Sequence, residues 1–214
     1  MPEADLILGV GDLIDRGPKS REVVNWFMET ENADTLFGNH EEMLLMVSAV
    51  ALAEQKMRSD VEHMWYCNGG QMTVSSYAGH DDEFLKALEW LNERSLYYEI
   101  EGLIVSHAPL IDFNLPKINS WHDENAHMFV WNRKPPNKHP NGIFQIYGHT
   151  GQLRISGDFD KDLDPVPKSE FAICVDDSHR HRLVGIHWTG DIHKSPVYIQ
   201  SEIQSNNGTV DTSG

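Results

Sequence analysis

Two observations predict a layered α/β fold for this chain. In the first half, short apolar runs lead into polar loops and then into segments with helical spacing; in the second half, short β-rich runs are separated by turn residues. Strand and helix units followed by further strands are typical of a layered protein with one mixed sheet or two packed sheets. The 214 residues, 40% of them hydrophobic, are enough to bury a core, so we expect a single domain over 1–200 and a polar tail over 201–214.

The first half is expected to alternate strands and helices. Residues 5–11 form an apolar run ending in Gly-Asp, which predicts a buried strand that opens into a loop. Helical spacing then extends over 19–30, and a second short strand is predicted over 35–37. Residues 41–58 contain good helix formers with an acidic first turn and a basic last turn, and 81–94 form a further amphipathic helix.

The second half is expected to be mainly β. Short runs rich in β-branched and aromatic residues predict strands at 96–100, 102–105, 144–147, 171–175, 183–187 and 196–200. The segments 112–142 and 151–170 both contain prolines, and we predict long loops there, whose length indicates a functional role.

The charge of the chain excludes several partners. Asp and Glu number 33 against 17 Lys and Arg, giving a net charge of −16, whereas binding to duplex DNA or an anionic membrane needs a basic face. The longest apolar run, residues 43–53, is too short to span a membrane. With two cysteines and no signal-like N-terminus, the sequence predicts a reduced, cytoplasmic protein that binds neither nucleic acid nor membranes; it leaves the oligomeric state open.

Four polar clusters each follow an apolar, strand-like run. They are Gly11-Asp12-Leu13-Ile14-Asp15-Arg16-Gly17, Gly38-Asn39-His40-Glu41, Ser106-His107-Ala108 and Gly148-His149-Thr150. Loops at strand ends are where α/β folds place their sites. The clusters contain three histidines, two aspartates and one asparagine. Two of the histidines, one aspartate and the asparagine make a nitrogen and oxygen ligand set suited to manganese, iron or zinc. The sequence therefore predicts a metal site.

These motifs, together with Trp131-Asn132-Arg133, resemble those of the calcineurin-like metallophosphoesterases. The subgroup that the chain resembles over about residues 5–190 is the bacterial and lambda-phage type of serine/threonine phosphoprotein phosphatase. The resemblance implies two mixed β-sheets packed face to face and flanked by helices. It also implies phosphomonoester hydrolysis by a hydroxide that two divalent ions activate, with Mn²⁺ as the first choice and iron or zinc as alternatives. The implied substrate is a phosphoprotein or phosphopeptide.

Roles for individual residues follow from the same resemblance. Asp12 would bridge the two ions, and the second metal site would be completed by Asn39, His107 and His149. His40 would be the general acid, because an imidazolium can protonate a leaving alkoxide near neutral pH, and Asp15 would orient it. Arg16 and Arg133 would bind the phosphate oxygens. Asn68-Gly69-Gly70 is similar to a loop on the substrate side of the subgroup.

One family motif is absent from the sequence. The Asp-x-His-Gly motif, which supplies the other ligands of the first metal site, does not occur, so we expect the first strand and helix unit to be missing and that site to retain only Asp12. We interpret the chain as an N-terminally truncated domain. Two alternatives therefore stay open: a catalytically impaired module that binds metal or phosphate, and a hydrolase similar to diadenosine tetraphosphatases, whose motifs are closely related.

Overall fold

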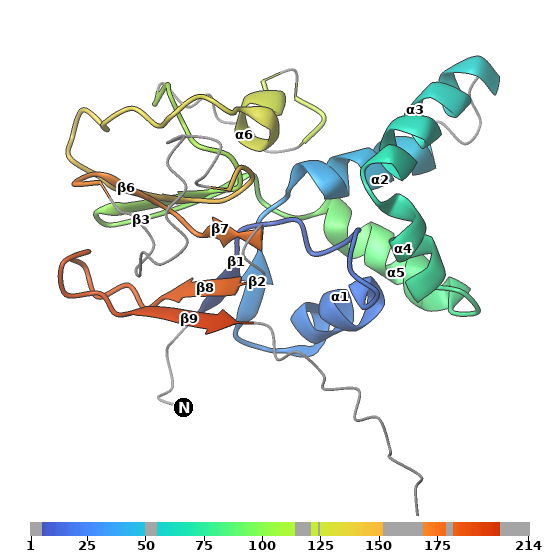
Figure 1. Ribbon diagram of the computed structural model, residues 1–214, viewed down its shortest axis with the longest axis horizontal. Coiled ribbons are helices and arrows are strands. Elements are labelled where there is room, and N and C mark those ends of the chain that lie inside the picture. Colours follow the sequence, from blue (N-terminus) through green and yellow to red (C-terminus); the bar gives the residue numbers. More distant parts are fainter. Residues whose placement is uncertain are drawn as a thin grey trace, which may run out of the picture.

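A computed structural model describes most of the chain (Figure 1). The described residues are 6–49, 55–113, 121–123, 125–151, 169–178 and 182–201. Most of the predicted loop at 151–170 and all but the first residue of the predicted tail lie outside these ranges.

Helices and strands alternate in the first part of the chain, and strands dominate the second. The helices are α1 (Ser20–Glu29), α2 (Asn39–Ala49), α3 (Gln55–Cys67), α4 (Gly70–Ser76), α5 (Asp81–Asn92) and α6 (His127–Trp131). The strands are β1 (Ile7–Gly9), β2 (Ala33–Thr35), β3 (Tyr97–Ile100), β4 (Leu103–Ser106), β5 (Phe144–Tyr147), β6 (Ala172–Cys174), β7 (Asp176–Asp177), β8 (Arg182–Ile186) and β9 (Val197–Ser201).

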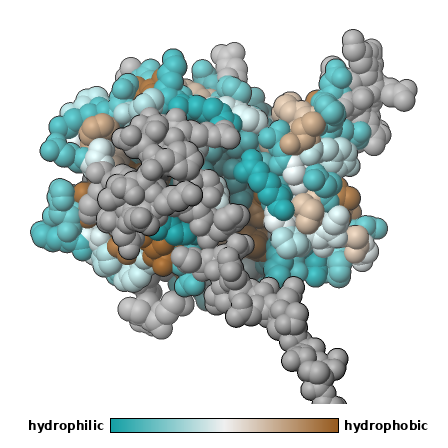
Figure 2. All heavy atoms as spheres, viewed as in Figure 1, coloured by the Kyte–Doolittle hydropathy of each residue, from teal (hydrophilic) through white to brown (hydrophobic). Residues whose placement is uncertain are grey.

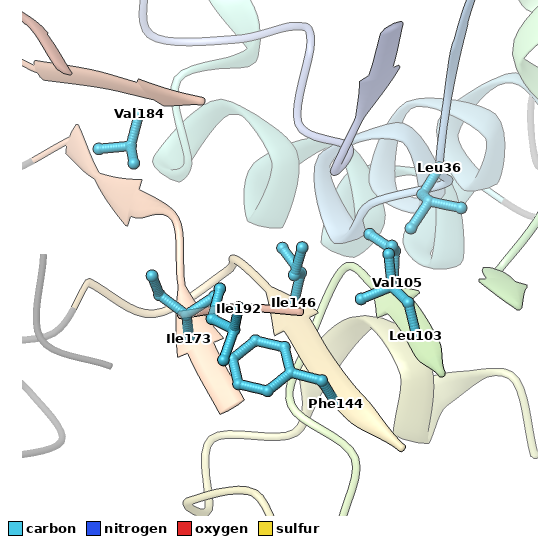
Figure 3. Packing of buried hydrophobic residues seen from close by; sticks show 8 residues of the cluster. All are labelled: Leu36, Leu103, Val105, Phe144, Ile146, Ile173, Val184 and Ile192. Carbon is cyan, nitrogen blue, oxygen red and sulfur yellow. The ribbon is translucent and has the colours of Figure 1, made fainter. Parts of the chain in front are cut away.

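The strands form layers that enclose an apolar core. One layer is a mixed sheet with the order β3-β4-β5-β6, in which β3 is antiparallel to β4 and the other neighbours are parallel. The facing layer contains the parallel pair β1-β2 and the antiparallel sheet β7-β8-β9. The core between the layers is shown in Figure 3; its buried members are Leu36, Leu103, Val105, Phe144, Ile146, Ile173, Val184 and Ile192. The layered α/β prediction is confirmed, but among the described strands only the four-stranded sheet is mixed.

The helices α1 to α5 gather on one side of the strands (Figure 1). A second core joins them, because Val24 of α1, Met43 of α2, Trp65 of α3 and Leu91 of α5 are buried in one cluster. A third cluster packs Phe129 and Val130 of α6 beside the mixed sheet.

The prediction of one helix over 41–58 is wrong. The structure has two helices, α2 and α3, which pack against one another and bring Trp65 into the same cluster as Met43. A single straight helix cannot do this, since residues 22 positions apart would lie about 33 Å apart along its axis. The predicted loop over 112–142 is also wrong in part, because it contains α6, a helix too short to show a periodic pattern.

The remaining predicted elements are confirmed within a few residues. The largest shift is in the second strand, which the structure places at Ala33–Thr35 rather than at 35–37, with Leu36 bridging to Ser95. On the face drawn in Figure 2, hydrophilic side chains predominate among the coloured residues, as the net charge of −16 suggests. None of the helices in the described ranges is long and apolar enough to cross a membrane.

Candidate metal and phosphate site

The candidate site lies where two pairs of parallel strands end. β1 and β2 are parallel, and so are β4 and β5, so each pair delivers its following residues to one edge. Asp12 follows β1 and Asn39 follows β2, whereas His107 follows β4 and His149 follows β5. The two halves of the mixed-sheet edge are tied together by the Gly148 N–H, which donates to the His107 carbonyl at 2.8 Å.

Four ligand atoms from these segments converge. Asn39 Oδ1 lies 2.8 Å from His149 Nδ1 and 3.1 Å from His107 Nε2, and the two histidine nitrogens are 3.2 Å apart. Asp12 Oδ1 lies 3.5 Å from His107 Nε2. Ligands held about 2.0–2.2 Å from one ion are separated by about 2.8–3.6 Å, so the spacing fits a shared cation. We call Asp12, Asn39, His107 and His149 the ligand cluster.

The chemistry of the ligand cluster also fits a divalent ion. The Nδ1–H of His107 donates to the Val10 carbonyl at 2.7 Å, which fixes the tautomer and leaves the Nε2 lone pair facing the other ligands. Burial, followed by the proximity of His107 and the charge of Arg133, lowers the pKa of His149 to about 3, so this imidazole stays neutral and able to coordinate. Burial raises the pKa of Asp12, but the neighbouring His107 and His40 outweigh it and hold that pKa below its ordinary value. Asp12 therefore offers a carboxylate.

Glu41 holds the loops that carry two of the ligands. Its fully buried carboxylate accepts the N–H groups of Asp12 and Gly38 at Oε2, both at 2.9 Å, and that of Leu13 at Oε1 at 2.8 Å. Burial and the charge of Asp12 raise the pKa of Glu41 to about 7, while the backbone N–H donors oppose the rise. The loops meet so closely that a Cβ on Gly38 would lie 2.4 Å from Asp12 Oδ1, which only glycine avoids.

A second group of side chains lies beside the ligand cluster. His40 Nδ1 lies 2.6 Å from Asp15 Oδ2, and both side chains are almost completely buried, with 2% and 0% exposure. Asp15 also accepts Trp65 Nε1–H at 2.9 Å and the Thr73 hydroxyl at 2.6 Å. Burial lowers the pKa of His40, but the hydrogen bond to Asp15 and the charge of Asp12 outweigh it, so the pKa lies above its ordinary value.

Arg16 is the third member of this group and contacts His40. Its Nη2 lies 2.8 Å from His40 Nε2, and because a guanidinium only donates, His40 must accept at Nε2 and donate from Nδ1 to Asp15. The Arg16 backbone N–H donates to the Gly69 carbonyl at 3.2 Å. We call Asp15, Arg16 and His40 the acid cluster.

Arg133 lies near His149 of the ligand cluster. It follows α6, where Trp131 Nε1–H donates to Glu42 and Asn132 Nδ2 donates to the Pro109 carbonyl at 2.5 Å. The guanidinium is exposed, and its charge contributes to the lowered pKa of His149. Arg16 therefore lies on the His40 side of the site and Arg133 on the His149 side.

Backbone strain is concentrated in the two clusters. Among the described residues, the non-glycine positions with positive φ are Asp12, Asp15, Arg16 and His149, with φ between 57° and 71°. Such left-handed conformations are uncommon for residues other than glycine, although Asp and His adopt them more readily than most, and they persist where the surrounding contacts hold them. Each of the four belongs to the ligand cluster or the acid cluster, which indicates a functional site at this edge.

The structure brings together all the site residues named from the sequence except Arg133, which it places at the border. Sequence reasoning missed three supporting residues: Glu41, Trp65 and Thr73. Glu41 stands inside the Gly38–Glu41 cluster, so that cluster was a signal for it. Trp65 and Thr73 contact Asp15 across 50 and 58 positions, and nothing local in the sequence indicates those contacts.

The fold and the ligand cluster together define a metal-binding α/β protein. Residues 1–166, more than half of the chain, match the family model described as calcineurin-like phosphoesterase. The chain belongs to the calcineurin-like phosphoesterase family, which implies a hydrolase that binds divalent metals.

The curated proteins that are similar to the chain include a tetraphosphatase and a protein phosphatase. Symmetrical bis(5'-nucleosyl)-tetraphosphatase of Methylobacillus flagellatus is 31% identical over 111 residues, which is 51% of this chain and 35% of that protein. Serine/threonine-protein phosphatase 1 of Salmonella typhimurium is 28% identical over 168 residues, which is 74% of this chain and 70% of that protein. The chain thus spans about a third of the length of the first relative and more than two thirds of the second.

Proposed function

We propose that this site hydrolyses phosphomonoesters with the help of divalent metal, and that its substrates are phosphoserine or phosphothreonine residues of proteins. The observation that carries the proposal is the contact of the acid cluster with the ligand cluster. The backbone N–H of His40 donates to Asp12 Oδ1 at 3.2 Å, while the two ring nitrogens of His40 are hydrogen-bonded to Asp15 and Arg16. A cation site and a candidate proton donor therefore lie side by side, as phosphoryl transfer to water requires.

Asp12, Asn39, His107 and His149 would hold the metal, with Mn²⁺ as the proposed native ion. When bound, divalent metal supplies positive charge for the phosphate oxygens and lowers the pKa of water at neutral pH. The described residues assemble one ligand cluster, and a second ion would share Asp12. Arg16 and Arg133 would hold the phosphate from its two sides by charge-assisted hydrogen bonds.

His40 would protonate the leaving oxygen. Asp15 keeps a proton on Nδ1 and so orients the ring, which directs Nε2 outward as the atom that exchanges the catalytic proton. Since Arg16 donates to the same Nε2, the guanidinium must turn from His40 to the phosphate before Nε2 can carry a proton. Binding of phosphate by Arg16 would thus release His40 for its role.

The same proposal includes a cytoplasmic location. It also excludes nucleic acid and membranes as partners, because the net charge of −16 repels both. A second candidate function is hydrolysis of dinucleoside polyphosphates, which the similarity to the tetraphosphatase of Methylobacillus flagellatus favours. The Asp15-Arg16 pair and Trp131-Asn132-Arg133 favour the phosphatase.

The test is turnover with Mn²⁺ of three substrates: a phosphoserine peptide, a small aryl phosphate and a dinucleoside tetraphosphate. We expect the first two to be hydrolysed and a chelator to abolish the reaction. Preference for the dinucleoside compound would replace the proposal by the second candidate. Metal content is measured in the same preparation. One bound ion without turnover of any substrate would rule out catalysis by this chain and identify it as a silent binding module.

A further inference from the structure

A cavity of about 420 Å³ opens beside the acid cluster, with Arg16 in its wall. The end of α3, the turn at 68–69 and the first turn of α4 form the rest. Besides Arg16, the lining residues are Tyr66, Cys67, Asn68, Gly69, Gln71 and Met72. Its volume lies within the range of about 300–1,000 Å³ that is typical of ligand pockets. Nothing in the ligand cluster or the acid cluster requires a cavity here.

The position of the cavity indicates which part of a substrate reaches it. His40 would protonate the leaving oxygen, so the body of the leaving alcohol must extend past His40. Arg16 joins the two places, because its Nη2 is hydrogen-bonded to His40 Nε2 and the residue lines the cavity. The cavity therefore lies on the leaving-group side of the site.

The lining favours a neutral occupant. Among the described residues around the cavity, Arg16 is the one charged side chain, and it is already assigned to the phosphate. A nucleotide leaving group would bring further phosphates, whose charges need additional cations. A peptide segment brings neutral amides instead, which match the amide groups of Asn68 and Gln71.

The apolar part of the lining is held in place before any ligand binds. The Tyr66 ring stacks on Trp65, with centroids 5.4 Å apart and planes at 24°. Trp65 is itself buried and bonded to Asp15. The Asn68 side chain is fixed by donating to the Met64 carbonyl at 2.8 Å. Tyr66, although 45% exposed, is thus a fixed apolar wall beside the flexible thioether of Met72.

We propose that this cavity binds an apolar side chain adjacent to the phosphorylated residue of a peptide substrate. Tyr66 and Met72 contact that side chain, and Asn68 and Gln71 bond the peptide backbone. The inference rests on the proposed function, because it uses His40 to identify the leaving-group side.

Binding tests this inference without requiring turnover. Calorimetry on the full chain with Mn²⁺ uses peptides whose phosphoserine is replaced by its non-hydrolysable phosphonate, with Leu, Gly or Lys placed at either neighbouring position. We expect Leu to bind about tenfold more tightly than Gly at one of the two positions, as partial burial of one aliphatic side chain provides. Tyr66→Ala should reduce this preference below twofold, whereas the control Tyr98→Ala, on the exposed face of β3, should retain it.

A second variant tests the cavity by adding a negative charge to its lining. Gln71 is exposed on the first turn of α4, so Gln71→Glu should fold normally and should make the Lys peptide bind at least as tightly as the Leu peptide. Absence of a Leu preference, or a preference that neither variant alters, overturns the inference. So does a Tyr66→Ala protein that loses affinity for a non-hydrolysable dinucleoside tetraphosphate but not for the peptide. Turnover of a small aryl phosphate reports separately on the proposed function.

Discussion

The ligand cluster and the acid cluster lie in contact, yet they satisfy their polar atoms in opposite ways. In the ligand cluster, Asp12 Oδ1, Asn39 Oδ1 and His107 Nε2 all present lone pairs. The donors that reach these atoms are the His40 backbone N–H, at Asp12 Oδ1, and His149 Nδ1, at Asn39 Oδ1. In the acid cluster each acceptor meets a donor: Asp15 accepts from His40, Trp65 and Thr73, and His40 accepts from Arg16. The first region needs a cation, and the second is completed by the protein.

The two regions also depend on different parts of the fold. The ligand cluster stands on strand ends above the sheet core, so its geometry follows the pairing of β1 with β2 and of β4 with β5. The acid cluster is held from the helical side, by Trp65 of α3 and Thr73 of α4. Substitutions can therefore separate metal binding from proton transfer.

The largest effect is expected from Asp12→Asn, which breaks the ligand cluster. Asparagine keeps the shape but removes the charge that a divalent ion requires, so metal affinity should fall strongly and turnover by about a hundred- to a thousandfold. Metal titration and turnover of an aryl phosphate measure the two effects. Asp34→Asn, at a half-buried position of β2, is the matched control and should retain both. Wild-type metal affinity in Asp12→Asn would remove this residue from the ligand cluster.

His40→Asn should break the acid cluster while leaving metal binding intact. Loss of a general acid reduces the rate by about 10²–10⁴-fold when the leaving group is a poor one, and much less when the leaving group is an acidic phenol. Rates for a series of phosphate esters with leaving groups of increasing pKa measure this difference. An equal loss across the series would show that His40 does not protonate the leaving oxygen. His193→Asn, on an exposed turn, serves as the control.

The residues of the ligand cluster and of the acid cluster could be predicted from the sequence because short motifs carry them. Each ligand follows a strand, and parallel strands end at one edge, so residues as distant as Asp12 and His149 could be expected to meet. The resemblance to a known family then assigned the roles of His40 and Asp15. Local patterns also gave most strands, since β-branched runs bounded by turns are short and distinct.

The contacts that support the acid cluster could not be predicted in this way. They depend on the packing of α3 against α2, and helical periodicity continues through residues 41–58 without indicating that packing. Once α3 folds back, Trp65 reaches Asp15 and α4 brings in Thr73. The seven residues of α4 and the five of α6 are too few for a periodic signal, although tertiary packing fixes both.

Glu41→Gln should affect both regions, since Glu41 holds the Asp12 loop and directly follows His40. The amide nitrogen cannot accept, so one of three backbone N–H groups loses its partner. Supporting residues behind metal ligands typically contribute about 10–100-fold to metal affinity, and we expect a loss in that range. Metal titration measures it, with Glu89→Gln on the exposed face of α5 as the control.

The same variant gives a pH signature in the metal-free protein. Because the pKa of Glu41 is raised from 4.5 to about 7, the folded protein holds this proton where the unfolded chain releases it. Stability should therefore fall as pH rises from about 4.5 through 7. Urea unfolding at pH 5 and pH 8 should show a larger loss for wild type than for Glu41→Gln. An equal loss in both proteins would assign the pH dependence to other groups.

The smallest effect on turnover is expected from Trp65→Phe, which tests whether the hydrogen bonds that hold Asp15 matter to the acid cluster. Phenylalanine keeps an aromatic ring under Tyr66 but removes the N–H that donates to Asp15. A hydrogen bond to a charged group contributes about 1.5–3 kcal/mol, and the smaller ring adds a packing loss, so the free energy of unfolding should decrease by about 2–4 kcal/mol. Urea unfolding measures this decrease, with Trp26→Phe on the exposed face of α1 as the control.

The kinetic consequence of Trp65→Phe decides whether that hydrogen bond acts through His40. With one donor fewer, Asp15 holds His40 less firmly, so we expect a loss of about tenfold for esters with poor leaving groups, smaller than that of His40→Asn. Metal affinity should be unchanged, because no atom of the ligand cluster contacts Trp65 in the hydrogen bonds of the described residues. If metal affinity falls together with the rate, the two clusters are coupled through α3, and the division between a cation-dependent region and a self-sufficient one no longer holds.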